Sequence, residues 1–269
     1  MAPDRPTSLV TGASSGIGAA FARALATRGH DLILTARRSD RLEALATDLR
    51  TRHATIATVL PCDLGDEGAP AGLMAAIGER GLRVDWLINN AGYGVPGTFA
   101  ANAWPTHAAF LRVLLEAPTE LAHRVLPGMR ERGYGRIVNV ASLAGFLPGS
   151  EGHTLYGAVK AYLITASQSL ALEYRGSGVN VCALCPGFTR TEFQDVTGMR
   201  AAVERLPGWM WQSAEAVVAE GIAAVERGDA VRVTGRVNRT IKAAVDLLPD
   251  RLALWISARQ SHRFRDMRR

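Results

Sequence analysis

Tyr156 and Lys160 are the side chains in this sequence whose types and spacing best suit acid–base chemistry. They lie four residues apart in a stretch of helical periodicity, so both are expected on one helix face, about a turn from each other. A phenol has a pKa near ~10, and a cation within a few ångströms lowers that pKa by roughly 1–3. The chain has two lysines among its 31 basic residues, which makes a lysine here informative. The pair predicts a proton-transferring tyrosine, with a surface tyrosine beside a solvated lysine as the alternative.

A hydroxyl group at the end of an expected strand completes this candidate site. Ser142 follows residues 136–141, a run typical of a buried strand. There it could hold a carbonyl oxygen between itself and Tyr156. Serine commonly ends strands, so Ser142 is a candidate site residue only because Tyr156 and Lys160 are expected nearby.

A glycine-rich turn, residues 11–18, joins an apolar strand at 7–11 to a helix that begins near Ala19. Glycine permits positive φ and lets a ligand approach the backbone closely. The N-terminus of the following helix offers unpaired N–H groups and a partial positive charge, which suits a phosphate group. This context favours a nucleotide-binding loop over an ordinary tight turn. The residues expected to bind the nucleotide here are Gly12, Ser14, Ser15, Gly16, Ile17 and Gly18.

Two arginines after the second expected strand, 31–36, indicate which nucleotide is bound. Dinucleotide-binding folds that prefer NAD usually place an acid there to bind the ribose hydroxyls, whereas this chain has Arg37 and Arg38. Guanidinium groups pair with a 2′-phosphate through charge-assisted bonds, so the predicted cofactor is NADP(H). The alternative is that both arginines belong to a solvated helix face.

The third and fourth expected strands, 56–63 and 84–89, end in further candidate contacts. Asp63 could accept a hydrogen bond from the adenine amino group, or it could cap a turn before Gly65. The turn at 89–92 could bring its backbone against the adenosine ribose. The cofactor contacts predicted at these two ends are Asp63, Leu64, Asn90, Ala91 and Gly92.

Strands and helices alternate along the whole chain, which predicts an α/β fold with a doubly wound parallel sheet and helices on both faces. Ligands bind such sheets where the strands end. No linker or repeat divides the sequence, so residues 1–235 are expected to form one domain, with 236–269 as its helical extension. The remaining expected elements are strands 179–185 and 231–234 and helices 41–46, 67–80, 104–132 and 156–174.

Five motifs, taken in order, resemble those of the compact, single-domain branch of the short-chain dehydrogenase/reductase family. The resemblance spans about residues 7–235 and implies a Rossmann-type sheet of about seven strands. It also implies hydride transfer between NAD(P) and a carbonyl or alcohol. The motifs are residues 11–18, 89–92, 142, 156–160 and 186–191.

The resemblance implies roles for individual residues. Tyr156 would donate the proton, and Lys160 would lower its pKa and bind the nicotinamide ribose. Ser142 would orient the substrate. Arg37 and Arg38 resemble the NADP-preferring pattern of the family. The cofactor contacts implied in the last motif are Pro186, Gly187, Thr189 and Thr191, the last of them at the nicotinamide carboxamide.

One position departs from the family pattern. The family usually has an asparagine in the helix after the fourth strand, upstream of a Leu-Pro-x-Met segment, and the corresponding residue here is Leu114. That asparagine is thought to hold a water that connects the lysine to solvent, and leucine can neither donate nor accept a hydrogen bond. Either another group or water carries the proton, or the activity is weakened.

Residues 188–211 resemble the flap that covers substrate and cofactor in this family. With Tyr93, Phe146 and Leu147, the flap would enclose an apolar pocket, which predicts a small hydrophobic ketone, aldehyde or secondary alcohol as substrate. Equally, its apolar residues could simply pack the flap onto the body. Those residues are Phe193, Met199, Trp209, Met210 and Trp211.

The excess positive charge, +6 at pH 7, lies in the segment from Arg236 onward. A basic C-terminal helix is typical of a solvated face, so no nucleic-acid partner is expected. Apolar residues of expected helices 237–248 and 249–261 could face the pocket, a partner subunit or a membrane surface, and docking on the protein is preferred over peripheral membrane contact. With no apolar run long enough to span a membrane and no signal-peptide core, a cytoplasmic protein is expected. A homodimer or homotetramer is also expected.

Three cysteines indicate a reducing compartment without structural disulfides. Cys182 and Cys185 have the CxxC spacing, but side chains three apart on a strand point to opposite faces. They are therefore predicted to be core cysteines rather than a redox or metal pair. No metal site is expected, since the six histidines form no ligand spacing.

The leading prediction is an NADP(H)-dependent oxidoreductase for an apolar carbonyl or alcohol. A nucleotide-binding sensor or scaffold that keeps the fold without turnover is the alternative. Leu114 lends weight to that alternative, whereas Ser142, Tyr156 and Lys160 count against it. An epimerase or dehydratase of the same fold is a third possibility.

Overall fold

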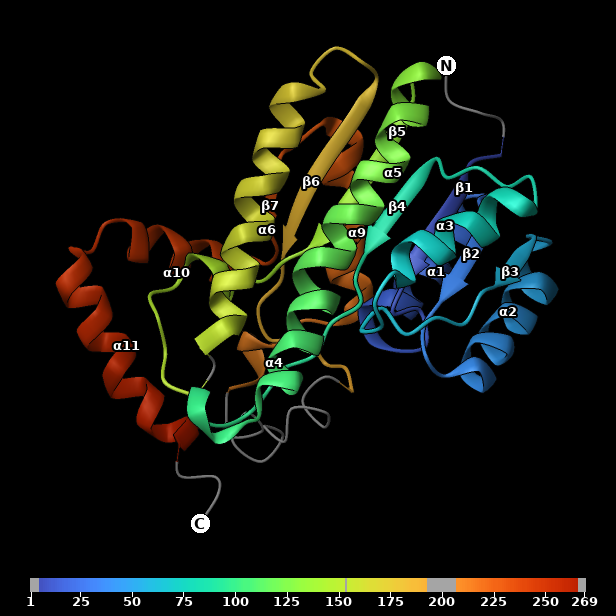
Figure 1. The fold of residues 1–269 in the computed structure, drawn as a ribbon. Coiled ribbons are helices and arrows are strands. Elements are labelled where there is room, and N and C mark those ends of the chain that lie inside the picture. Colours follow the sequence, from blue (N-terminus) through green and yellow to red (C-terminus); the bar gives the residue numbers. More distant parts are fainter. Residues whose placement is uncertain (1–4, 153, 193–206, 266–269) are drawn as a thin grey trace.

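The computed structural model describes residues 5–152, 154–192 and 207–265 and contains one seven-stranded sheet. The strand order is β3-β2-β1-β4-β5-β6-β7, and all neighbouring strands are parallel (Figure 1). This confirms the predicted doubly wound α/β fold. The strands are β1 (Thr7–Thr11), β2 (Asp31–Thr35), β3 (Ala57–Val59), β4 (Trp86–Asn89), β5 (Gly135–Val140), β6 (Val179–Cys185) and β7 (Val231–Val233).

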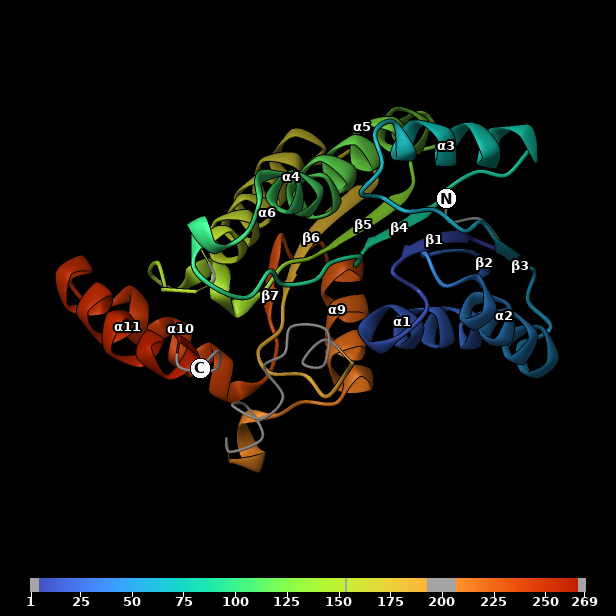
Figure 2. The same cartoon turned by 60° about the horizontal axis from the view of Figure 1, so that its bottom comes forward.

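Helices cover both faces of the sheet (Figure 2). Central strands such as β4 are therefore buried along their whole length, which explains their continuous apolar runs. One face carries α1 (Gly16–Thr27), α2 (Ser39–His53) and α9 (Ala214–Arg227). The opposite face carries α3 (Ala69–Glu79), α4 (Trp104–Leu111), α5 (Ala117–Glu131) and α6 (Thr154–Glu173).

The chain reverses its direction across the sheet between β1 and β4. The strands β1, β2 and β3 follow one another toward one edge, and β4 returns to the other side of β1. In open α/β sheets this switch point leaves a crevice at the carboxyl ends of the strands, where ligands bind. The predicted nucleotide loop follows β1 and lies at this crevice.

The third strand is shorter than predicted. The chain continues beside β2 after Val59, because Leu60 N–H donates to Leu34 O and Cys62 N–H donates to Ala36 O. Pro61 has no N–H to offer, so the regular ladder ends before it. The predicted strand 56–63 is thus Ala57–Val59 with an irregular extension.

The predicted helical stretch 104–132 is helical from Trp104 to Glu131, but it is not one regular α-helix. A π-helical turn, η2 (Arg112–Glu116), separates α4 from α5, and Pro118 lies in the first turn of α5. Proline cannot donate the N–H bond that a continuous α-helix needs at this point. The widened turn contains Leu114.

Cys182 and Cys185 are fully buried free thiols on opposite faces of β6, as predicted. Cys182 belongs to the core under α1 and α9, whereas Cys185 packs against α6 and β7. Burial raises the pKa of each thiol to about 12. Both are therefore protonated core residues.

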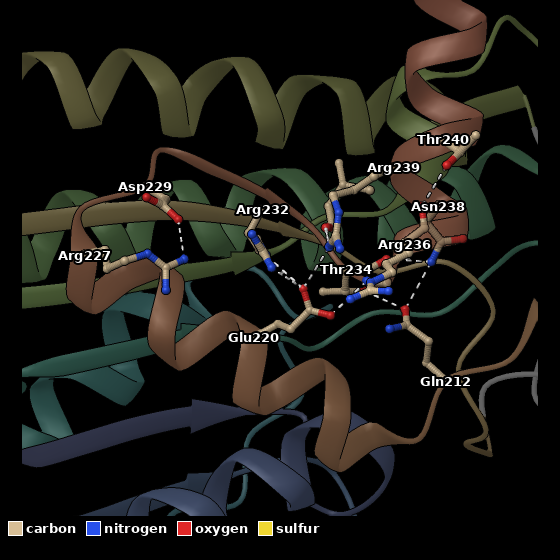
Figure 3. A network of polar contacts seen from close by, with 12 residues as sticks. Gln212, Glu220, Arg227, Asp229, Arg232, Thr234, Arg236, Asn238, Arg239 and Thr240 are labelled. Atoms are coloured by element: carbon tan, nitrogen blue, oxygen red, sulfur yellow. Dashed lines mark hydrogen bonds and ion pairs between the residues drawn. The ribbon is translucent and has the colours of Figure 1, made fainter.

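Two further helices, α10 (Arg236–Asp246) and α11 (Asp250–Arg265), extend beyond β7 (Figure 1). Glu220 on α9 anchors the first of them: its carboxylate accepts from Arg232 on β7 at 2.6 Å and from Arg239 on α10 at 3.2 Å (Figure 3). The same carboxylate accepts from Gly235 N–H at 2.9 Å. The start of α10 is thereby fixed at the carboxyl end of β7.

Candidate active site

A cavity of about 790 Å³ lies at the carboxyl ends of the strands. Its lining brings together every predicted site residue except Gly18. The predicted residues in the lining are Gly12, Ser14, Ser15, Gly16, Ile17, Arg37, Arg38, Asp63, Leu64, Asn90, Ala91, Gly92, Ser142, Tyr156, Lys160, Pro186, Gly187, Thr189 and Thr191.

The glycine loop between β1 and α1 has the shape of a phosphate site. Gly12 has φ of 64°, a conformation that side chains rarely adopt. Ser15 precedes α1, but its hydroxyl does not cap the helix, so the first N–H groups stay open to a ligand. Gly18 serves packing instead, because a Cβ there would lie 2.3 Å from Gly12 O. Its predicted direct contact with the nucleotide is not supported by this position.

Asn90, after β4, holds the glycine loop in place. Its Nδ2 donates to Thr11 O at 3.0 Å and to Gly12 O at 3.3 Å. In return, Thr11 Oγ1 accepts from the N–H groups of Asn90 and Ala91 at 2.9 and 3.0 Å. The two loops on either side of the switch point are therefore joined by polar contacts, which shape the floor of the cavity.

Arg38 dominates the end of the cavity beyond β2. Its Nη2 donates to the hydroxyl oxygens of Ser14 and Ser15 at 3.1 and 2.9 Å, while its Nη1 lies 3.0 Å from a carboxylate oxygen of Glu192. Arg37 is more exposed, and its Nη1 lies 4.0 Å from Asp63. Arg38 is thus the arginine built into the glycine loop.

Asp63 makes one contact that the sequence predicted and one that it did not. Its Oδ1 accepts from Gly65 N–H at 2.9 Å, which is the turn cap considered from the sequence. Its Oδ2 faces Arg37, and the residue also lines the cavity. The carboxylate can therefore cap the turn while one oxygen remains directed at the arginine.

Ser142, Tyr156 and Lys160 meet on one wall of the cavity. Ser142 follows β5 and forms a side-chain hydrogen bond with Tyr156 on α6. Lys160 lies one turn further along α6, and its Nζ is 5.6 Å from the centroid of the Tyr156 ring. Nζ also donates to Val140 O at 2.7 Å. The structure thus brings together the three side chains that the sequence singled out, and their catalytic roles stay a prediction.

The pKa of Tyr156 differs from the expectation. Burial raises this pKa above its ordinary value, and the hydrogen bond with Ser142 opposes the rise. Burial also lowers the pKa of Lys160 to about 8, because an ammonium group that is 5% exposed loses hydration. The pKa of Tyr156 thus shifts in the direction opposite to the one expected from Lys160, because burial penalises the phenolate.

The segment after β6 closes the cavity from the other side. Leu143 N–H donates to Pro186 O at 2.9 Å, which ties the end of β5 to the end of β6. Gly187 is required by α10, because a Cβ there would lie 2.4 Å from Asn238 Oδ1. Figure 3 shows Asn238 beside Gln212, whose backbone bonds to Phe188 and Arg190 across the base of the flap.

The substrate end of the cavity is largely apolar. Tyr93, Leu147 and Met210 line it as predicted, and so does Phe188. Phe146 does not line the cavity, because its ring packs under Lys242 at 5.0 Å. Trp209 is 67% exposed, and Trp211 packs on Phe188 with 5.7 Å between ring centroids. Phe193 and Met199 lie outside the described residues.

The C-terminal helices contribute residues to this pocket. Ile241 on α10 and Ser257 on α11 line the cavity, and Ser257 Oγ donates to Gly149 O at 2.8 Å. The pocket was one of three surfaces that the sequence left open for the apolar residues of α10, and Ile241 is such a residue. No local signal marked Ser257, because its contact is with a loop 108 residues away.

Leu114 lies in the wall of the cavity and is 1% exposed. It packs against Gly92, where a Cβ would lie 3.5 Å from its Cγ. The position predicted for a polar relay is thus filled by an aliphatic side chain. Leu114 belongs to the π-helical turn η2.

Two absences concern only the described part of the chain. There, no group of three or more His, Cys, Asp and Glu side chains could hold a metal ion. Among the same residues, no helix is both long and apolar enough to cross a membrane.

Known proteins resemble this chain in sequence and in fold. Oxidoreductase UcpA from Salmonella typhimurium is 36% identical over 185 residues, which cover 69% of this chain and 70% of that protein. A short-chain dehydrogenase from Sphingobium yanoikuyae, solved in complex with NADPH, is 35% identical, with a TM-score of 0.80 over 95% of this chain and 97% of that one. A bulky-bulky ketone specific alcohol dehydrogenase from Comamonas testosteroni is 32% identical, with a TM-score of 0.75 over 96% of each chain.

The family match agrees with the fold and with the order of the motifs. A family model described as short chain dehydrogenase matches residues 6–200, which include the glycine loop and the Ser142, Tyr156 and Lys160 cluster. The chain therefore belongs to the short-chain dehydrogenase/reductase family, as an NAD(P)-dependent oxidoreductase that acts on CH–OH or C=O groups.

Proposed function

We propose that this enzyme uses NADP(H) to reduce an apolar ketone or aldehyde, or to oxidise the corresponding secondary alcohol. The observation that carries the proposal is a single cavity with two chemically distinct ends. One end has an open helix N-terminus and Arg38, and the other has Ser142, Tyr156 and Lys160 beneath an apolar wall.

The residues present fit a dinucleotide with a 2′-phosphate. The open N–H groups of α1 suit the pyrophosphate, and the left-handed backbone at Gly12 keeps that approach free of side chains. Arg38 offers a guanidinium group beside the hydroxyls of Ser14 and Ser15, which suits a phosphate monoester. The similar protein from Sphingobium yanoikuyae was solved with NADPH, which supports the same choice here.

The protein's own residues supply the proton and the orientation. When bound, the nicotinamide ring supplies or accepts the hydride. Tyr156 gives its hydroxyl proton to the carbonyl oxygen, and Ser142 holds that oxygen by a second hydrogen bond. The raised pKa of Tyr156 keeps its hydroxyl protonated at neutral pH, so the proton is present for transfer. Lys160 places a positive charge over the Tyr156 ring, whose oxygen becomes negative when the proton leaves.

The pocket favours a substrate with substantial apolar surface. Leu147, Phe188, Met210 and Ile241 offer carbon surface around the reacting end. The similar alcohol dehydrogenase from Comamonas testosteroni is described as specific for bulky-bulky ketones, which supports this substrate class. We therefore expect ketones with apolar groups on both sides of the carbonyl to be better substrates than short polar ones.

One experiment separates this enzyme from a nucleotide sensor. Thermal stabilisation by NADPH and by NADH is measured first, and NADPH oxidation is then followed with a panel of apolar ketones and aldehydes. Preferential stabilisation by NADPH with turnover supports the proposal. Binding without turnover across a broad panel would favour the sensor. Leu114, in place of the asparagine usual in the family, is the residue that favours that alternative.

Arg38→Ala is expected to weaken NADPH binding about 10- to 100-fold and to leave NADH binding within about threefold. The reason is that hydrogen bonds to a charged phosphate are lost only for the phosphorylated cofactor. Dissociation constants from fluorescence titration check this. Arg37→Ala serves as the comparison and is expected to have a smaller effect, because Arg37 makes no contact with the glycine loop in the described structure. Equal losses for both cofactors would contradict the assignment.

Leu114→Asn is expected to leave kcat unchanged or raised, since it restores a polar group at the family's relay position. The substitution buries an amide where leucine was, so a stability loss of about 1–3 kcal/mol is expected. Turnover and thermal unfolding measure the two effects separately. Leu115→Asn, one residue along the same turn, is the control. A large loss of kcat in Leu114→Asn alone would show that this helix position has been misassigned.

A further inference from the structure

Glu192 makes an ion pair at the place where the 2′-phosphate is expected. Its two carboxylate oxygens are divided between two arginines: Oε2 lies 3.0 Å from Arg38 Nη1 and Oε1 lies 2.6 Å from Arg41 Nη1. Hydrogen bonds from Arg41 and Arg38 hold the pKa of Glu192 below its usual value. The carboxylate is therefore charged at neutral pH.

All three guanidinium nitrogens of Arg38 make contacts in this arrangement, through four of the five N–H donors of the group. Nε and Nη2 donate to the hydroxyls of Ser14 and Ser15, and Nη1 donates to Glu192. A phosphate monoester and a carboxylate accept the same charge-assisted bonds from a guanidinium group. Glu192 thus occupies donor capacity that the cofactor's phosphate needs.

Building on the proposed function, we infer that Glu192 is a specificity-determining residue that competes with the 2′-phosphate of NADP(H) for Arg38. A phosphate monoester carries about −1.5 to −2 charge at pH 7. Arg38 and Arg41 together carry two positive charges, which Glu192 half neutralises. The phosphorylated cofactor must therefore displace the carboxylate or bind beside a like charge, and NAD(H) meets no such competition at this position.

Glu192 also adjoins a predicted cofactor contact in the sequence. Glu192 directly follows Thr191, whose side chain packs over the start of α1: a Cβ on Gly16 would lie 3.1 Å from Thr191 Cβ. Glu192 is therefore directly bonded to a residue that lies close to the glycine loop and lines the cavity.

The test compares the affinity of the whole protein for four probes: NADPH, NADH, 2′,5′-ADP and 5′-AMP. Glu192→Gln keeps the size of the side chain and removes its charge. It is expected to tighten NADPH and 2′,5′-ADP about three- to tenfold, with NADH and 5′-AMP within about twofold. Glu192→Ala is expected to give the same pattern. Isothermal titration calorimetry measures all four affinities.

Glu43→Gln is the matched control, because Glu43 lies on α2, pairs with Arg50 at 3.8 Å and carries the same charge. It is expected to change none of the four affinities by more than about twofold. Unchanged or weakened NADPH binding in both Glu192 variants would overturn the inference, as would an equal gain for all four probes. The proposed function would stand in those cases. It fails instead if the unmodified protein binds neither NADPH nor NADH.

Discussion

Tyr156→Phe is expected to lower kcat for carbonyl reduction by about 10²- to 10⁴-fold, with the dissociation constant for NADPH within about twofold of the original. The substitution removes one hydroxyl group and keeps the ring, which packs against the apolar cluster that contains Leu114 and Val159. Ser142 loses its hydrogen-bond partner, but the carbonyl oxygen loses its proton donor, which is the larger effect. Single-turnover NADPH oxidation and cofactor titration measure the two quantities independently.

Tyr93→Phe provides the control for this experiment. Tyr93 also lines the cavity, and its ring packs edge-on against Phe110 at 5.7 Å between centroids. Its hydroxyl is not part of the Ser142 and Lys160 cluster, so kcat is expected to change by less than about threefold. Equal losses in both variants would point to general disturbance of the pocket. Turnover unaffected by Tyr156→Phe would remove Tyr156 from the mechanism.

Most of the fold could be predicted because buried parallel strands leave a plain signal. Residues 86–89 and 179–185 are apolar on both faces, since helices cover both sides of the sheet. The site at the strand ends followed from the same pattern, because parallel strands bring their carboxyl ends to one edge. Tyr156 and Lys160 could be paired because four residues make about one turn of helix.

The parts that sequence reasoning missed depend on local breaks or on distant contacts. Pro61 follows the early end of β3, and Pro118 lies in the first turn of α5, just after the π-helical turn. The contacts of Glu192 with α2 and of Ser257 with Gly149 join residues more than 100 positions apart. No periodicity predicts such pairs, because they depend on how the finished layers approach one another.

The pKa of Tyr156 shows a different limit of sequence reasoning. A cation one helical turn away predicts a lowered pKa, and the sequence places that cation correctly. How deeply Tyr156 and Lys160 are buried decides whether the pKa of Tyr156 rises or falls, because burial penalises the phenolate and the ammonium ion alike. Burial depends on α6, β5 and η2 together, because Tyr156 packs with the cluster that includes Leu114 and Lys160 bonds to Val140, so it became visible only in the assembled fold.

The catalytic efficiency kcat/KM for NADPH is expected to fall as the pH rises above about 8, where Lys160 loses its proton. Burial has lowered this pKa from 10.5, so the ammonium charge is complete at neutral pH and disappears through the alkaline range. Without that charge, Tyr156 and the cofactor's oxygens lose their nearest positive partner on α6. The decline is expected to approach roughly tenfold for each further pH unit, and initial rates between pH 6.5 and 9.5 measure it.

Lys160→Arg tests whether Lys160 causes this decline. Arginine keeps its charge throughout the range, so its profile is expected to stay flat above pH 8, at a lower plateau because the guanidinium group is bulkier. Lys160→Ala is expected to lose about 10²-fold or more at every pH. Among the described residues of the cavity, Cys62, Tyr93 and Tyr156 have pKa values raised by burial, so each titrates at higher pH than in water. A decline that survives in Lys160→Arg would therefore assign the titration to another group and remove Lys160 from the proton chemistry.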